Sequence, residues 1–172
     1  MNSWKQLRAV LLLPGMVTVV IPATILYGTG LAWPPQPWNS ILPVIGSTFI
    51  FLGLALMVWT NRLFITVGKG TLAPWNPTQK LVVRGVYRHV RNPMIVGVFC
   101  ILLGEAIFFD SWPLLCLVGF VVLVNLIYIP LSEEPGLAKR FGDDYLLYMK
   151  NVPRWIPRFT PWEGLSDPAE LK

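Results

Sequence analysis

Residues 84–109 read RGVYRHVRNPMIVGVFCILLGEAIFF, and they join a basic cluster directly to an apolar run. Three arginines and the only histidine of the chain fall between Arg84 and Met94. A plain membrane anchor needs a few flanking cations. It has no need of a tyrosine, an Asn-Pro pair and a nearby glycine as well. The stretch therefore indicates a membrane-spanning helix whose first turn holds something polar and anionic at the membrane surface.

The composition favours an integral membrane protein. Of 172 residues, 54% are hydrophobic and only 13% are charged, and the mean hydropathy is +0.57. A soluble domain carries about 25% charged residues. The eight tryptophans and sixteen prolines fit the same class, because tryptophan favours bilayer interfaces and proline is tolerated in spanning helices. We expect residues 1–172 to form a single all-α membrane domain.

Four apolar runs predict about four transmembrane helices, since roughly 20 apolar residues span a bilayer. They lie at residues 10–33, 41–60, 94–109 and 114–131. A stiff turn at residues 33–38 follows the first run, and a tight turn at 110–113 makes the last two a hairpin. Lys5 and Arg8 before the first run resemble a signal peptide. That run is too long for one and no clear cleavage site follows it, so we expect a retained span.

The basic residues predict the topology. All fourteen cations precede the first run, separate the second from the third, or follow the fourth. By the positive-inside rule, both termini, the loop at 61–93 and the segment at 132–172 face the cytoplasm. A bacterial or archaeal plasma membrane fits this pattern best, although an endoplasmic reticulum membrane would look the same. Cations confined to segments between apolar runs indicate membrane topology rather than a nucleic-acid surface.

The start of the third run has the features of an anion site. Pro93 suits the first turn of a helix and Asn92 is a natural N-cap. The amides and positive dipole end of that helix attract a carboxylate or phosphate, and Arg88 and Arg91 add forked donors. Simple contacts to lipid headgroups explain the same residues equally well.

A second polar cluster begins where the fourth run ends. Glu133 and Glu134 could bind a cationic ligand or accept a proton, or they could be a solvated first turn favoured by the helix dipole. Further residues at helical spacing predict an amphipathic helix on the bilayer surface: Leu137, Phe141, Tyr145 and Tyr148. Arg154 could reach the loop site or face lipid phosphate.

Three other residues invite simpler interpretations. Glu105 lies near the non-cytoplasmic end of its span, where snorkelling or protonation is easier than catalysis. Cys100 and Cys116 lie inside apolar runs and have no Cys or His partner at metal-binding spacing, so we expect packing roles and no metal site.

Together, the two clusters resemble a known family. Residues 85–97 are similar to a Gly-x-Tyr … Arg-(His/Asn)-Pro-x-Tyr-x-Gly signature, and residues 133–153 to Glu-Glu-x-x-Leu … Phe-Gly-x-x-Tyr-x-x-Tyr … Val-Pro. These are signatures of the isoprenylcysteine carboxyl methyltransferase and phospholipid methyltransferase group of integral membrane enzymes. The resemblance covers nearly half of the chain.

The resemblance implies S-adenosylmethionine as methyl donor, S-adenosylhomocysteine as product, and a lipophilic substrate that enters from the bilayer. Arg91 would position an anionic acceptor, and Glu134 would act as a base or a cofactor ligand. The residues implied to line the cofactor pocket are Gln79, Lys80, Leu81, Val82, Tyr87, Asn92, Pro93, Met94, Ile95, Glu133 and Glu134.

Departures from the signatures keep the acceptor open. Asn92 replaces the more familiar histidine, Ile95 replaces a tyrosine, and the residues before Glu133 lack the arginine that prenylcysteine methyltransferases carry. Carboxyl methylation remains the first hypothesis, with methylation of a phospholipid or small amine as the alternative. A membrane reductase is a further alternative, because sterol reductases share a similar Arg-x-x-Asn-Tyr-x-Gly pattern. The last alternative is a non-catalytic membrane protein that binds anionic lipid.

Overall fold

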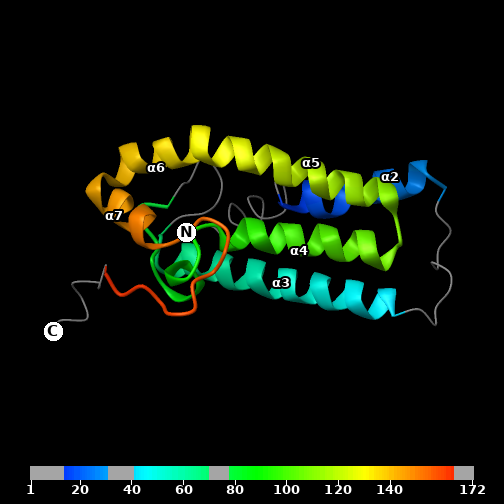
Figure 1. Ribbon diagram of the computed structural model, residues 1–172, viewed down its shortest axis with the longest axis horizontal. Coiled ribbons are helices and arrows are strands. Elements are labelled where there is room, and N and C mark those ends of the chain that lie inside the picture. The colour runs from blue at the N-terminus through cyan, green and yellow to red at the C-terminus, as the bar shows by residue number, and fades with distance from the viewer. Residues whose placement is uncertain (1–13, 31–40, 70–77, 165–172) are drawn as a thin grey trace.

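The computed structural model describes residues 14–30, 41–69 and 78–164, and within these ranges the regular structure is entirely helical (Figure 1). The predicted all-α class is confirmed. The predicted turn at residues 33–38, together with Lys5, Arg8 and Lys172, lies outside the described residues.

The helices follow the apolar runs closely. A π-helical turn at Met16–Val20 leads into α2 at Ile21–Gly28, and α3 covers Leu42–Thr66. After a 3-10 turn at Gly85–Arg88, α4 covers Pro93–Phe108 and α5 covers Trp112–Tyr128. A second π-helical turn at Ile129–Glu133 connects α5 to α6 at Glu134–Phe141, and α7 covers Asp143–Asn151.

Two helical stretches are long and apolar enough to cross a membrane: Leu42–Thr66 and the continuous helix Trp112–Phe141. Met16–Gly28 and Pro93–Phe108 are apolar but shorter. Four spans therefore remain a prediction. The second span was predicted to end at residue 60, but α3 continues to Thr66. The amide of Asn61 donates to the Met57 carbonyl 2.9 Å away, so this polar side chain is satisfied by its own helix and does not end it.

The helix expected to run from Glu134 through Tyr148 is instead two short helices. Gly142 separates them with φ 58°, a left-handed conformation that favours glycine. At its first residue, α6 continues directly from α5 through the π-helical turn. Pro130 and Pro135 have no backbone N–H to donate to the carbonyl four residues earlier. This accounts for the local change from α-helical to π-helical hydrogen bonding.

The packing of α3 against α4 depends on two pairs of facing glycines. A Cβ atom on Gly53 would lie 2.6 Å from the carbonyl oxygen of Gly97, and one on Gly46 would lie 2.7 Å from that of Gly104. The two helices therefore run antiparallel in close backbone contact, as small residues allow in membranes, and Figure 1 shows them side by side. This contact fixes the first turn of α4 beside the last turns of α3.

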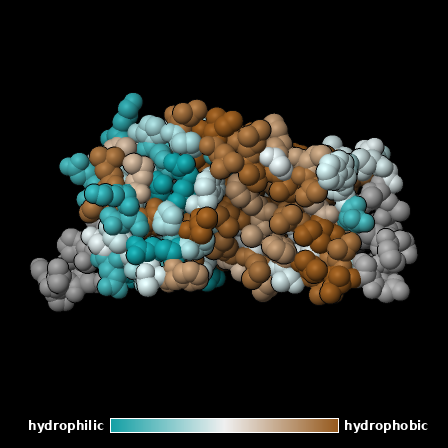
Figure 2. Space-filling view, viewed as in Figure 1, coloured by the Kyte–Doolittle hydropathy of each residue, from teal (hydrophilic) through white to brown (hydrophobic). Residues whose placement is uncertain are grey.

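The surface separates into two regions (Figure 2). An apolar band covers the region of α3, α4 and α5, and a polar end carries α6 and α7. Large apolar side chains of α3 and α5 are exposed, among them Val44, Phe51, Phe120 and Leu123. An apolar surface of this extent fits contact with lipid, in keeping with the membrane class that the composition predicted.

Candidate functional site

A cavity of about 510 Å³ lies between α4, α5, α6 and α7, within the range of about 300–1,000 Å³ that is usual for small-molecule sites. Much of the predicted site meets there. The predicted residues in its wall are Leu81, Val82, Tyr87, Arg91, Asn92, Met94, Ile95 and Glu133. The two sequence signatures thus form facing walls of one cavity.

The other predicted residues lie outside the cavity wall. Gln79 and Lys80 are exposed, and Pro93 is fully buried beneath the wall. Glu134 is also buried, and its carboxylate accepts a hydrogen bond from Arg91. Arg88 points elsewhere, since its Nε donates to the Trp162 carbonyl at 2.7 Å and a terminal nitrogen lies 3.5 Å from Glu163.

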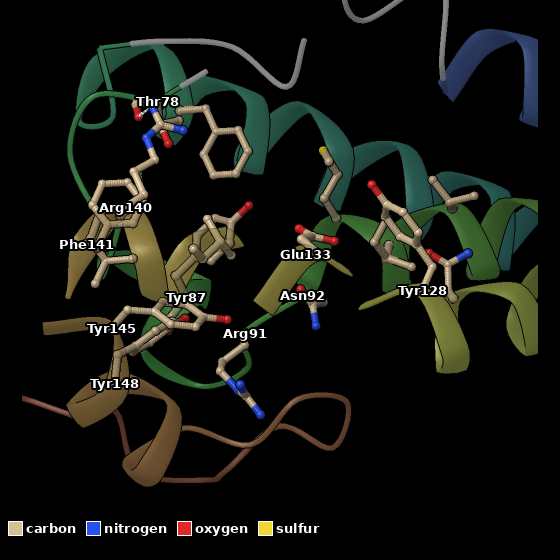
Figure 3. A pocket seen from close by; sticks show the side chains of 18 of the residues that line it. Thr78, Tyr87, Arg91, Asn92, Tyr128, Glu133, Arg140, Phe141, Tyr145 and Tyr148 are labelled. Carbon is tan, nitrogen blue, oxygen red and sulfur yellow. Dashed lines mark hydrogen bonds between the residues drawn. The ribbon is translucent and has the colours of Figure 1, made fainter. Parts of the chain in front are cut away.

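Much of the wall was missed by the sequence reasoning. Figure 3 shows Glu133 and Asn92 between two groups, with Arg140 and the aromatic side chains on one side and Tyr128 on the other. The further wall residues are Pro14, Val17, Phe64, Thr78, Val98, Val121, Asn125, Tyr128, Leu137, Arg140, Phe141, Tyr145 and Tyr148. The helical spacing of the last aromatic residues and the lone Asn125 in an apolar run were usable signals. No sequence signal pointed to Val17 or Phe64 as wall residues.

Glu134 is the centre of a buried charge cluster. Its Oε1 accepts from Arg91 Nη1 at 2.7 Å and from Arg154 Nε at 2.8 Å, while its Oε2 accepts from Arg154 Nη2 at 2.7 Å. The side chains of Arg91 and Glu134 are each only 9% exposed, and that of Arg154 is 30% exposed. Both oxygens of this carboxylate are therefore occupied by guanidinium donors.

Two buried N–H donors in the wall have no acceptor among the described residues: Arg91 Nε and Asn92 Nδ2. Asn92 stands at the N-cap position of α4, as predicted, but its side chain makes no capping hydrogen bond. The first backbone bond of α4 runs from the Val96 amide to the Asn92 carbonyl, so the amides of Met94 and Ile95 have no partner within the helix. Side-chain and backbone donors thus gather at one point of the cavity.

Aromatic packing holds the loop that carries Arg91. The buried Tyr148 hydroxyl donates to the Tyr87 carbonyl at 2.7 Å, and the Tyr87 ring stacks on Phe64 with 5.4 Å between centroids. Burial raises the pKa of Tyr148, so its hydroxyl is a neutral donor at physiological pH. This bond fastens α7 to the first signature.

We expect Tyr148→Phe to lower the free energy of unfolding by about 1–3 kcal/mol, because it leaves the buried Tyr87 carbonyl without a donor. Thermal unfolding in detergent, followed by tryptophan fluorescence, would measure the loss. Tyr27→Phe is the control, since Tyr27 is 90% exposed on α2. Equal melting temperatures for the two variants would contradict the importance of this hydrogen bond.

The segment at residues 153–162 fastens the same loop from the other side. The Arg91 amide donates to the Pro153 carbonyl at 2.9 Å, and the Arg158 and Trp162 amides donate to the carbonyls of His89 and Arg88, each at 3.0 Å. His89 Nδ1 lies 2.8 Å from the Arg158 carbonyl oxygen. Because a carbonyl only accepts, this nitrogen carries the proton. The basic loop is therefore held by protein contacts on two sides.

Comparison with known proteins finds two kinds of methyltransferase that resemble this chain. The phospholipid methyltransferase family matches residues 72–144. The chain is 34% identical to a protein-S-isoprenylcysteine O-methyltransferase of Schizosaccharomyces pombe over 82 residues, which cover 48% of this chain and 35% of the relative. It is 29% identical to a phosphatidylethanolamine N-methyltransferase of Zygosaccharomyces rouxii over 98 residues, covering 56% of this chain and 11% of the relative.

The chain spans about a third or less of the length of these relatives. Both are fungal, so they do not support the predicted prokaryotic membrane. No solved structure matches the chain. The matched region contains the first signature, the α4–α5 hairpin, the Glu133-Glu134 pair and α6. Residues 72–144 of this chain are therefore similar to the phospholipid methyltransferase family, and the chain resembles parts of an isoprenylcysteine methyltransferase and of a phosphatidylethanolamine methyltransferase.

Proposed function

We propose that this protein transfers a methyl group from S-adenosylmethionine to a lipophilic acceptor at the cytosolic face of a membrane. The observation that carries the proposal is the pair of buried, unpartnered donors in the cavity wall, Arg91 Nε and Asn92 Nδ2, beside the carboxylate of Glu133. A zwitterionic ligand fits such a wall, because it brings an acceptor to the donors and a cation to the carboxylate.

The described residues fit S-adenosylmethionine. Arg91, Asn92 and the first amides of α4 would hold its carboxylate, and Glu133 would hold its ammonium. The rings of Tyr87 and Phe141 are in the wall, and aromatic faces favour both a nucleoside base and a sulfonium cation. When bound, this cofactor supplies an activated methyl group.

The chain's own residues would act mainly by positioning and by excluding water, which are the main requirements of a methyl displacement. Glu133 is the better candidate base of the glutamate pair. Within the described ranges no hydrogen bond or ion pair joins it to another side chain, whereas Glu134 has both oxygens occupied. Glu133 follows the apolar run and lines the cavity, so its carboxylate can reach a bound ligand.

The apolar side of the cavity suits a lipid chain. Val17, Val98, Val121 and Tyr128 line this side, and Figure 2 shows the polar end of the molecule meeting the apolar band. Four spans with both termini in the cytoplasm would place this junction at the cytosolic membrane surface. The membrane lipids would then be the medium from which the acceptor enters.

Methylation of an amine is the second candidate reaction, and the charges of the wall favour it. Of the two arginines in the wall, Arg91 is paired with Glu134 and Arg140 donates to the Thr78 carbonyl. Glu133 is a carboxylate that could take a proton from an ammonium acceptor before methyl transfer. A carboxylate acceptor would need no base.

We expect saturable binding of S-adenosylhomocysteine to the purified protein, measured by isothermal titration in detergent. Asn92→Ala should weaken it about tenfold, because it removes a donor to an anionic group and breaks no protein hydrogen bond. Arg91→Met should weaken it by about 10- to 150-fold. Binding in a closed pocket should also resist added salt, unlike binding of lipid headgroups at the surface.

Arg62→Met is the matched control, since Arg62 is an exposed arginine on α3 outside the cavity wall. It should bind like the wild-type protein. Absence of saturable binding to the wild-type protein would overturn the proposed function. Equal binding by wild type, Asn92→Ala and Arg91→Met would remove these donors from the cofactor site.

A further inference from the structure

We propose that Arg154 is a positioning residue that acts through Glu134 to direct the guanidinium of Arg91 at the cofactor's carboxylate. This inference rests on the proposed function. It gives Glu134 an orienting role and assigns a task to a residue outside the matched family region, since Arg154 follows residue 144.

The hydrogen bonds define the orientation. Arg154 uses Nε and Nη2 to grip both oxygens of Glu134 at 2.8 and 2.7 Å, the forked arrangement that fixes a carboxylate plane. Glu134 Oε1 then accepts from Arg91 Nη1 at 2.7 Å. In a planar guanidinium, Nε and Nη2 share the edge away from Nη1. Holding Nη1 therefore directs the Nε edge, and Nε is the buried donor with no acceptor among the described residues.

The charges of the cluster call for an anion. Two guanidinium groups share the two oxygens of Glu134, the Arg91 side chain is only 9% exposed, and Arg91 Nε still has no acceptor among the described residues. A buried charged donor without an acceptor is unfavourable unless a partner compensates it. The nearby Tyr145 hydroxyl brings no charge at physiological pH, because burial raises its pKa. A ligand carboxylate would complete the cluster.

The backbone around Arg154 is held firmly enough for this role. Val152 is 1% exposed, and the Pro153 carbonyl accepts from the Arg91 amide at 2.9 Å. The Trp155 ring lies against Phe99 of α4, with 5.6 Å between centroids. Figure 3 shows Arg91 extending toward this C-terminal segment. Fixed neighbours on both sides are what a positioning side chain requires.

Two ligands separate a positioning role from a merely structural one. S-adenosylhomocysteine carries the carboxylate, whereas 5′-methylthioadenosine has the nucleoside and the sulfur but no amino-acid group. Arg154→Met should weaken S-adenosylhomocysteine binding about tenfold and leave 5′-methylthioadenosine binding unchanged. Arg158→Met is the control from the same segment, because its side chain donates to the exposed Asn151 carbonyl, and it should change neither affinity.

Coupling supplies the second readout. If Arg154 acts through Glu134, the double variant Arg154→Met/Glu134→Gln should bind S-adenosylhomocysteine no more weakly than Glu134→Gln alone. Should Arg154→Met fail to fold, Arg154→Lys keeps the charge without the fork and should give a smaller loss confined to the same ligand.

The outcomes distinguish this inference from the function on which it rests. A wild-type protein that binds neither ligand overturns the proposed function. A wild-type protein that binds both, with Arg154→Met and Arg154→Lys unchanged, overturns only the positioning role. Equal losses for both ligands, or additive losses in the double variant, also overturn it.

Discussion

Glu134→Ala is expected to lower the free energy of unfolding by about 3–5 kcal/mol, the usual cost of removing one partner from a buried ion pair. The loss is large because one carboxylate accepts three hydrogen bonds from two arginines. Without it, Arg91 keeps a positive charge in a side chain that is only 9% exposed. Thermal unfolding in detergent should show a fall of roughly 2–4 °C for each kcal/mol lost.

The adjacent Glu133 provides the control. Glu133→Ala removes the same chemical group one position earlier, but no hydrogen bond or ion pair joins the Glu133 carboxylate to another described side chain. Its melting temperature should stay close to that of the wild type, while methyl transfer should fall if Glu133 faces the ligand. Equal destabilisation by the two variants would mean that the charge cluster is not what stabilises this region.

Gly53→Leu is expected to cost about 3 kcal/mol, at the upper end of the range for overpacking. A Cβ at this position would lie 2.6 Å from the Gly97 carbonyl oxygen and 3.0 Å from the Ile101 amide nitrogen. These are backbone atoms of α4 and cannot rotate away, so the two helices must separate. Because α4 carries Asn92 at its N-cap, S-adenosylhomocysteine binding should weaken together with stability.

Gly119→Leu tests whether the effect comes from the helix contact or from glycine replacement itself. A Cβ on Gly119 would meet nothing within 4 Å, and the added side chain would lie on the apolar surface of α5. Its melting temperature should match or exceed that of the wild type, since leucine favours helix more than glycine does. A Gly119→Leu variant as unstable as Gly53→Leu would argue against the close packing of α3 on α4.

Features that depend on local sequence were predictable. The start of α4 at Pro93, with Asn92 before it, follows from the position of a proline behind a capping residue. The Glu133-Glu134 pair shows where local reasoning ends. Neighbours on a helix point about 100° apart, so one faces the cavity and the other the arginines. Which is which depends on how α6 packs, and the sequence alone left that choice open.

Other differences also arise from tertiary packing. Asn92 stands at the predicted cap position, yet its amide has no bond to the helix, because the fold places it against the cavity. Val17 joins the wall only because the first helix packs beside α4 and α5. The break at Gly142 could be suspected from the glycine. The continuation of α5 into α6 could not, because two prolines suggest an interruption there.

The continuous helix Trp112–Phe141 has a mechanical consequence. Its 30 residues form a rod of about 45 Å at 1.5 Å per residue. Tyr128 in the lipid-side wall, together with Glu133 and Arg140 in the polar wall, belongs to this one rod. The opposite donors, Arg91 and Asn92, are attached to α4 and to the C-terminal segment. A tilt of the rod, such as a change in bilayer thickness produces, therefore alters the width of the lipid entrance and the gap between Glu133 and Asn92 together.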